Sequence, residues 1–273
     1  MCIRDRFETE ARVPKLTLLG PVNARAYGDA KAVAARKAYY VELLAYLALH
    51  PNGVDAPEVA SAFTISKNRV YVDIATIRNW LGVDPRTGEH FVPRLKATRG
   101  TREYLESRYR VTGVLSDYAL FRRLRARGQA RGPDGVADLQ LALHLICGAP
   151  FSQLRDRGWN WLLEGERLDL ISTCAIVDVA HIVTTHGLAV DDLEMARTAA
   201  ESAYLAAPYD DISRLDLVQV AAATGHTELA ERHLRDGVFN RSDNDYGPID
   251  LPERTARIVK QSGWDRPRNR TQH

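Results

Sequence analysis

The sequence predicts a mainly α-helical protein of two parts, of which only the first also contains β-strands. Three observations support this prediction. Apolar residues recur at three- and four-residue spacing over most of the chain, short strand-like runs occur only between residues 15 and 111, and the charge changes sign along the chain. The 273 residues are 45% hydrophobic and 26% charged, which is typical of soluble globular proteins and leaves room for two domains.

The net charge of +2 is an average over two parts of opposite charge. Residues 1–113 carry 18 Lys and Arg against 12 Asp and Glu, a net of +6. Residues 132–273 carry 14 against 22, a net of −8, and the segment between them adds five arginines against one aspartate. A basic part joined to an acidic part suggests an anion-binding module attached to a second module, although uneven composition alone gives the same pattern.

The first part is expected to begin with two short strands and to continue with a helix. Lys15–Val22 alternates weakly and ends at the turn Gly20-Pro21, and a second short strand is expected around Ala24–Tyr27. The apolar spacing then predicts a helix over Ala32–His50, which Pro51-Asn52-Gly53 ends.

Two further helices are expected to follow, joined by a short turn. Asp55 has the chemistry of an N-cap for a helix at Ala56–Phe63. Ser66 can cap a third helix that runs to Leu81 and is closed by Gly82. One stripe of this third helix is apolar and is expected to face the core: Val70, Ile74, Ile77 and Leu81.

Beyond Pro85 the chain becomes strand-like and basic. Strands are expected at Phe91–Val92, Leu95–Ala97 and Tyr109–Val111, among six basic residues. A strand, three helices with a tight second turn and a basic hairpin form the order of a winged helix-turn-helix. The sequence therefore predicts this motif at residues 13–113, with the third helix offered to a major groove.

Residues 114–260 are expected to be all helix, whereas residues 1–12 and 261–273 are expected to be disordered. Ala196, Ala203 and Pro208 fall where a 34-residue helical-hairpin repeat has its small residues and its closing proline, and Ala230 lies 34 residues after Ala196. Such matches also arise by chance in an alanine-rich bundle, but they favour tetratricopeptide-like packing. The expected helices are Asp117–Arg127, Gly135–Ile146, Trp161–His186, Val190–Ala206, Ile212–Thr224 and Thr227–Val238.

Five segments carry a resemblance to a known family. They are LTLLGPV (Leu16–Val22), SKNRVYVDIATIRNWLG (Ser66–Gly82), SDYALFRRLRARG (Ser116–Gly128), LQLALHLICGAPF (Leu139–Phe151) and the hairpin Ala203–Leu234. In this order they resemble bacterial transcriptional activators of the antibiotic-regulatory-protein type. Those proteins join an OmpR/PhoB-like winged helix to a bacterial transcriptional activator domain. The same pair also occurs at the C-terminal end of larger proteins with membrane segments upstream, so this chain is alternatively the C-terminal part of such a protein.

The resemblance implies that the third helix and the wing contact DNA. With the apolar stripe turned inward, the outward side chains are expected to be Lys67, Arg69, Tyr71, Asp73, Thr76 and Asn79, with Arg78 placed to reach a phosphate. Along the wing, the expected contacts are Arg94, Lys96, Arg99 and Arg102. The family's Arg-Leu-Arg-Arg cluster is replaced here by Thr76, Ile77, Arg78 and Asn79, and Asp73 adds a negative charge. An ordinary solvated helix face would show the same spacing.

No motif for catalysis, a metal or a cofactor emerges. A Gly-rich phosphate loop, a His-Glu-x-x-His and a Cys-x-x-Cys are all absent from the sequence, and His181 and His186 are five residues apart, which places them poorly for one metal. The three cysteines, Cys2, Cys147 and Cys174, are expected to be reduced thiols. We expect a non-enzymatic protein without cofactor.

The favoured function is that of a cytoplasmic, DNA-binding transcriptional regulator. Double-stranded DNA is its expected partner, with RNA polymerase and a second copy of the chain as further partners of the helical part. No membrane contact is expected within this chain, because it has no run of 18 apolar residues. The alternative is a protein-interaction module at the C-terminus of a larger membrane-anchored protein, in which the winged helix no longer binds DNA.

Overall fold

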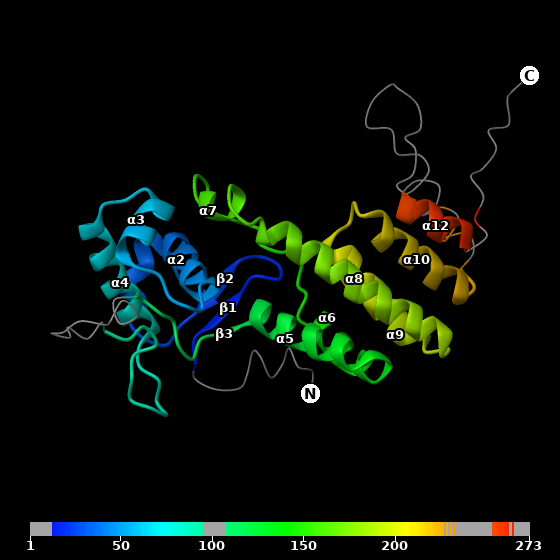
Figure 1. Ribbon diagram of the computed structural model, residues 1–273, viewed down its shortest axis with the longest axis horizontal. Coiled ribbons are helices and arrows are strands. Elements are labelled where there is room, and N and C mark those ends of the chain that lie inside the picture. The colour runs from blue at the N-terminus through cyan, green and yellow to red at the C-terminus, as the bar shows by residue number, and fades with distance from the viewer. Residues whose placement is uncertain are drawn as a thin grey trace, which may run out of the picture. The chain divides into compact units, whose positions relative to one another are not determined.

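The computed structural model describes residues 13–94, 108–226, 228, 230, 232, 253–261 and 264 (Figure 1). The predicted fold class is confirmed: a small sheet and a winged helix-turn-helix come first, and the rest is helical. The chain divides into two compact units, one with the residues up to Arg123 and Pro150–Ser172, the other with Leu124–Ala149 and the residues from Thr173 onward. This division differs from the predicted single boundary after residue 113, because Pro150–Ser172 packs with the first unit.

The sheet of the first unit has three short strands in the order β2-β1-β3. Strand β1 (Lys15–Thr17) pairs antiparallel with β2 (Asn23–Arg25), with Leu16 opposite Ala24. Strand β1 also pairs in parallel with β3 (Leu115–Ser116), which the sequence did not predict. The sheet buries Leu16 completely and so forms one wall of the core.

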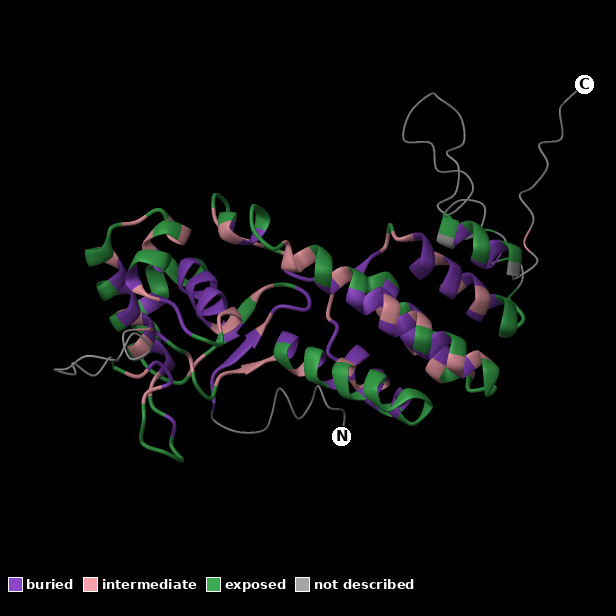
Figure 2. Ribbon diagram, viewed as in Figure 1, coloured by how far each residue is buried: buried purple, intermediate pink, exposed green. Residues whose placement is uncertain are grey.

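Helix α2 (Lys37–Leu49) runs through the middle of the first unit and is buried along most of its length (Figure 2). The 3₁₀-helix η1 (Ala30–Arg36) precedes it, so the predicted single helix begins with a tighter turn. Helices α3 (Ala56–Phe63) and α4 (Lys67–Leu81) have the predicted bounds. Their caps are local: the Asp55 carboxylate accepts the Glu58 amide at 2.8 Å, and the Ser66 hydroxyl accepts the Arg69 amide at 3.3 Å.

The predicted hairpin is described only at its base. Neither Phe91–Val92 nor Tyr109–Val111 is a strand, which corrects the prediction. Tyr109 forms an isolated bridge with Val54, and the Thr112 amide donates to the Phe91 carbonyl at 2.9 Å. The predicted strand Leu95–Ala97 lies outside the described residues.

Pro150–Ser172 is attached to α2 by a buried carboxylate. Glu42, 1% exposed, accepts the backbone amide of Trp159 at 2.6 Å and the indole N–H of Trp161 at 3.1 Å, and it also pairs with the guanidinium of Arg155. Donors from three residues thus converge on one acid, which balances the cost of burying it. The sequence offers no local signal for this contact, because Glu42 and Trp159 are 117 residues apart.

The predicted helix Trp161–His186 is two helices, α7 (Asn160–Leu163) and α8 (Leu168–Ala189). The break is set by the backbone between them. Arg167 has a φ of 49°, and a Cβ on Gly165 would lie 2.3 Å from the Trp161 carbonyl oxygen. The backbone therefore departs from helical geometry at these two residues.

The regular elements among the described residues of the second unit are all helices. The unit contains the later part of α5 (Asp117–Ala130), then η2 (Gly132–Gly135), α6 (Val136–Leu143), most of α8, α9 (Leu193–Ala206), α10 (Asp211–Ala223) and α12 (Glu253–Gln261). Helix α12 was not predicted; Ile258 and Val259 pack against Ile212 and Leu215 of α10. Residues 228, 230 and 232 are helical, and the rest of the predicted helix Thr227–Val238 lies outside the described residues.

Small residues let the helices of the second unit approach closely, as the repeat pattern predicts. Ala196 and Ala203 are completely buried, and Ala230 is 6% exposed. A Cβ on Gly187 of α8 would lie 3.1 Å from the Cβ of Ala196 on α9. Ala196 also lies in one apolar cluster with Val220 of α10.

Helix α8 is long and apolar enough, by length and composition, to cross a membrane, with a mean hydropathy of 1.5 over its most apolar window. However, 44% of that window is buried within the protein. Val177 of α8, for instance, packs in the cluster that contains Ile212 and Leu215. Part of this helix therefore packs in the core, while Leu170, Ile171 and Ile182 are exposed.

Candidate nucleic-acid interface

Helix α4 has one apolar face, which is buried as predicted. Val70, Ile74, Ile77 and Leu81 are at most 1% exposed. The turn that joins α3 to α4 is short because Thr64 adopts a left-handed conformation, with a φ of 52°. Together these features hold α4 against its neighbours with its other face toward solvent.

The C-terminal end of α4 is fixed by the loop that follows β2. The Gly28 amide donates to the Trp80 carbonyl at 2.9 Å, and the Asp29 amide donates to the Asn79 carbonyl at 3.0 Å. A Cβ at Gly28 would lie 2.1 Å from the Asn79 carbonyl oxygen, so only glycine permits this approach. The backbone of this helix end is therefore held without use of the Asn79 side chain.

Three of the predicted DNA-contacting side chains lie on the exposed face. Lys67, Tyr71 and Asn79 are exposed, and Tyr71 is 55% exposed beside Val72, which is equally exposed. Thr76 is half-buried, and its hydroxyl donates to the Val72 carbonyl at 2.9 Å. Contact of these side chains with DNA stays a prediction.

Asp73 does not project outward, and that expectation is wrong. It is 1% exposed, and its carboxylate accepts the hydroxyl of Tyr39 at 2.7 Å and the hydroxyl of Tyr40 at 3.0 Å. Burial and the Asp73 carboxylate both raise the pKa of Tyr39. The burial of Asp73 could have been predicted from the sequence. Position 73 is three residues after Val70 and four before Ile77, so it lies on the buried stripe itself. Sequence reasoning missed Tyr39 and Tyr40 as its partners.

Arg69 is tied to the same carboxylate. Its Nε lies 3.0 Å from Oδ2 of Asp73, and its Nη2 lies 2.9 Å from Oδ1. The side chain is nevertheless 41% exposed. A phosphate approaching Arg69 would meet a guanidinium whose charge is largely offset by an adjacent carboxylate.

Arg78 is turned toward the segment that leads into the predicted wing. Its Nε donates to the Val92 carbonyl at 2.7 Å. Burial lowers the pKa of Arg78, and the charge of Arg94 lowers it further. The two guanidinium groups are therefore near each other, and Arg94 is exposed. The other predicted wing contacts, Lys96, Arg99 and Arg102, lie outside the described residues.

Two other arginines of this basic segment serve packing. Arg108 donates to the Gly53 carbonyl at 2.8 Å and pairs with Glu58 at 2.8 Å. Arg110 donates to the Asn52 carbonyl at 3.3 Å. These contacts hold the chain after the predicted wing against the start of α3.

Within the part of the chain that the structure describes, no three His, Cys, Asp or Glu side chains gather as a metal site would need. His181 instead bonds the buried Asp216, with Nδ1 and Oδ1 2.8 Å apart. Of the two described cysteines, Cys147 is half-buried and Cys174 is exposed, and neither of them is in a disulfide.

Comparison with known proteins supports the fold. A scan against protein-family models and a search of the curated proteins give no match. Among solved structures, the chain is similar to Mycobacterium tuberculosis EmbR, solved in complex with a low affinity phosphopeptide, with a TM-score of 0.54 and 17% sequence identity. The match covers 92% of this chain but 66% of the EmbR chain, so this chain spans just under two thirds of that protein's length. At this identity the similarity shows a shared fold.

Proposed function

We propose that the chain is a DNA-binding transcriptional regulator, in which α4 enters the major groove of promoter DNA. The observation that carries the proposal is the two-faced packing of α4. Its apolar stripe is buried in the core of the first unit, to which α4 belongs. Its opposite face exposes Lys67, Tyr71 and Asn79 to solvent. A helix held in this way by a short turn is the arrangement that helix-turn-helix proteins use to read base edges.

Charge supports the same proposal. Residues 1–113 carry a net charge of +6, and Arg78, in the last turn of α4, lies near Arg94. Phosphate binding requires several cations on one surface. The fold shared with EmbR and the resemblance to activators of the antibiotic-regulatory-protein type agree with a regulator. In this proposal the helical part, with its net charge of −8, makes the dimer, effector or polymerase contacts in the cytoplasm.

The test measures how tightly the full chain binds a random-sequence duplex. Fluorescence anisotropy monitors the binding at a series of salt concentrations. The full chain is used because Pro150–Ser172 packs with the winged-helix unit. We expect affinity to fall as salt rises, with a linear dependence of log affinity on log salt concentration. Absence of binding at low salt by a folded protein would overturn the proposal.

One observation favours a second function, a surface for protein contact. Tyr71 and Val72 are neighbours on the outer face of α4, and each is 55% exposed. Exposed apolar side chains side by side are common in protein interfaces. If α4 binds a protein partner instead of DNA, Val72→Ser will disrupt the complex with that partner. If α4 binds DNA, the same substitution will leave the salt dependence of duplex binding unchanged.

A further inference from the structure

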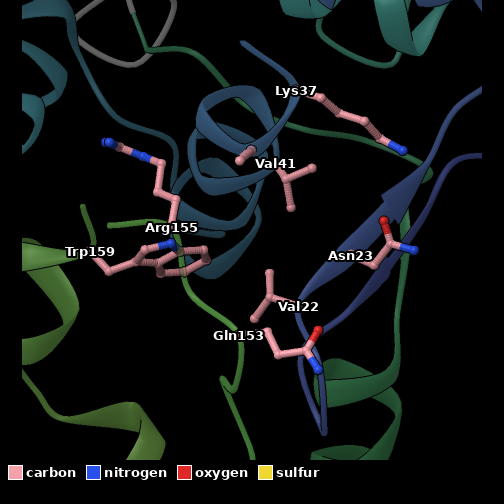
Figure 3. Close-up of a pocket in the computed structure, with 8 residues that line it drawn as sticks. Val22, Asn23, Lys37, Val41, Gln153, Arg155 and Trp159 are labelled. Carbon is pink, nitrogen blue, oxygen red and sulfur yellow. The ribbon is translucent and has the colours of Figure 1, made fainter. Parts of the chain in front are cut away.

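A cavity of about 300 Å³ opens in the first unit, and none of its lining residues belongs to α4 (Figure 3). Three segments form it: the start of β2, the first turn of α2 and the loop that precedes α7. Its size is at the lower end of the range for small-molecule sites. All of its lining residues belong to one compact unit, so the cavity is part of a single folded body.

The lining combines an apolar surface with a free cation. Val22, Val41 and Trp159 form the apolar part of the wall, with Val41 5% and Trp159 1% exposed, and Lys37 and Asn23 lie together at one side of the space (Figure 3). Lys37 is exposed and makes no ion pair with any residue that the structure describes. Its ammonium group can therefore bind an anionic group without first breaking a salt bridge.

The other cation of the lining is already committed. The Arg155 guanidinium pairs with the buried Glu42 and lies over the ring of Tyr39, 5.4 Å from its centroid. Figure 3 shows its guanidinium turned away from Lys37 and Asn23. The charge offered to a ligand is thus that of Lys37 alone among the lining residues, which favours a single anionic group.

The loop side of the cavity is built in an unusual backbone conformation. Gln153 and Trp159 both line the cavity and both have a positive φ, 57° and 64°. Such conformations cost free energy in residues with a Cβ and persist where surrounding contacts impose them. The Glu42 carboxylate supplies one such contact, because it accepts the Trp159 amide at 2.6 Å. The Trp159 ring is itself packed against the rings of Phe151 and Trp161, with centroids 6.4 and 5.3 Å away, so its position is fixed before any ligand arrives.

We propose that this cavity binds a small carboxylate with an apolar body. Lys37 pairs with the carboxylate, the side-chain amide of Asn23 donates a hydrogen bond to it, and the apolar body lies against Val22, Val41 and Trp159. A single cation at one side and an aromatic ring at the other suit a molecule with one charged end. This site goes beyond the proposed contact with DNA and does not depend on it.

The test uses octanoate as probe, with octanamide as its neutral analogue of the same length. Binding to the full chain is measured by titration calorimetry and by tryptophan fluorescence, to which Trp159 contributes together with the three other tryptophans of the chain. We expect octanoate to bind and octanamide to bind about tenfold more weakly or not at all, because it lacks the charge that Lys37 recognises.

Three variants decide whether the probe occupies this cavity. Lys37→Gln should weaken octanoate binding about tenfold, and Lys31→Gln, which changes an exposed lysine outside the lining, should not. Ala38→Trp fills the space from its exposed rim on α2 and should abolish binding while the circular dichroism spectrum shows a folded chain. The proposal is overturned if octanoate does not bind, if octanamide binds equally well, or if Lys37→Gln and Ala38→Trp bind octanoate as the unmodified chain does.

Discussion

The guanidinium of Arg69 and the carboxylate of Asp73 face each other in a two-point ion pair, with N–O distances of 3.0 and 2.9 Å. The pair joins a half-exposed cation on α4 to a carboxylate that two tyrosine hydroxyls also hold from α2. Asp73 therefore has two effects. It satisfies buried hydroxyl groups in the core, and it reduces the positive charge that α4 presents to a phosphate.

Asp73→Asn should separate these two effects. The amide removes the negative charge and leaves one fewer acceptor for the donors of Tyr39, Tyr40 and Arg69, so we expect the free energy of unfolding to fall by about 1–3 kcal/mol. Arg69 then keeps its full charge, and nonspecific duplex binding should tighten with a steeper salt dependence. Urea unfolding and anisotropy measure the two effects. Asp134→Asn, at an exposed position of the second unit, is the charge-matched control and should change neither.

Lys67→Gln should weaken duplex binding without affecting folding. Lys67 is exposed at the first position of α4, so its loss removes a charge and no packing. We expect the slope of log affinity against log salt to become shallower by about one. Arg232→Gln changes an exposed cation of the helical unit and serves as the control. Equal effects of the two substitutions would mean that α4 is not the DNA-contacting element.

Arg78→Ala should affect both DNA binding and local structure. Its guanidinium donates to the Val92 carbonyl, so its loss removes a contact that holds the segment before residue 95. We expect weaker duplex binding, a shallower salt dependence and faster amide hydrogen exchange at Thr112, which bonds the neighbouring Phe91. Weaker DNA binding with unchanged exchange would show that Arg78 acts through its charge alone.

Glu42→Gln should destabilise the first unit by about 3 kcal/mol, because it removes the charge that the buried cluster of Arg155, Trp159 and Trp161 requires. Denaturant unfolding followed by tryptophan fluorescence measures this change. Glu89→Gln, which alters an exposed glutamate of the same unit, should leave the midpoint unchanged. Equal midpoints for the two variants would show that the Glu42 contacts do not hold Pro150–Ser172.

The stability of the first unit should depend on pH through Asp117. This buried carboxyl accepts the amides of Leu18 and Leu19, but desolvation dominates and raises its pKa from the ordinary 3.8 to about 6. The folded state therefore binds the proton more tightly than the unfolded state. The stabilisation from this group is complete below pH 3.8 and is lost as pH rises through about 6, by up to about 3 kcal/mol.

Denaturant unfolding of the unmodified chain and of Asp117→Asn across pH 4 to 8 checks this dependence. The variant has no titrating group at position 117, so the difference between the two free energies of unfolding isolates the contribution of Asp117. We expect that difference to change between pH 4 and 6 and to be constant above pH 7. A constant difference over the whole range would contradict the raised pKa.

Much of the fold could be predicted because its signals are local. The bounds of α3 and α4 follow from Asp55, Ser66 and Gly82, which act within one turn of the helix that they begin or end. The buried stripe of α4 follows from helical periodicity, and the small residues Ala196 and Ala203 follow from the repeat spacing. Part of the candidate site follows in the same way, since the exposed positions of Lys67, Tyr71 and Asn79 are set by the same periodicity.

The sequence by itself determined the helix order, the winged-helix motif and the face of α4 that meets solvent, because caps, turns and periodicity act between residues close in the chain. Only the tertiary structure decided where the buried charges go. Asp73 meets hydroxyls 33 and 34 residues away, and Glu42 holds a loop 117 residues away. A buried carboxylate must find donors wherever the fold brings them, and that pairing depends on distances in space that no local pattern encodes.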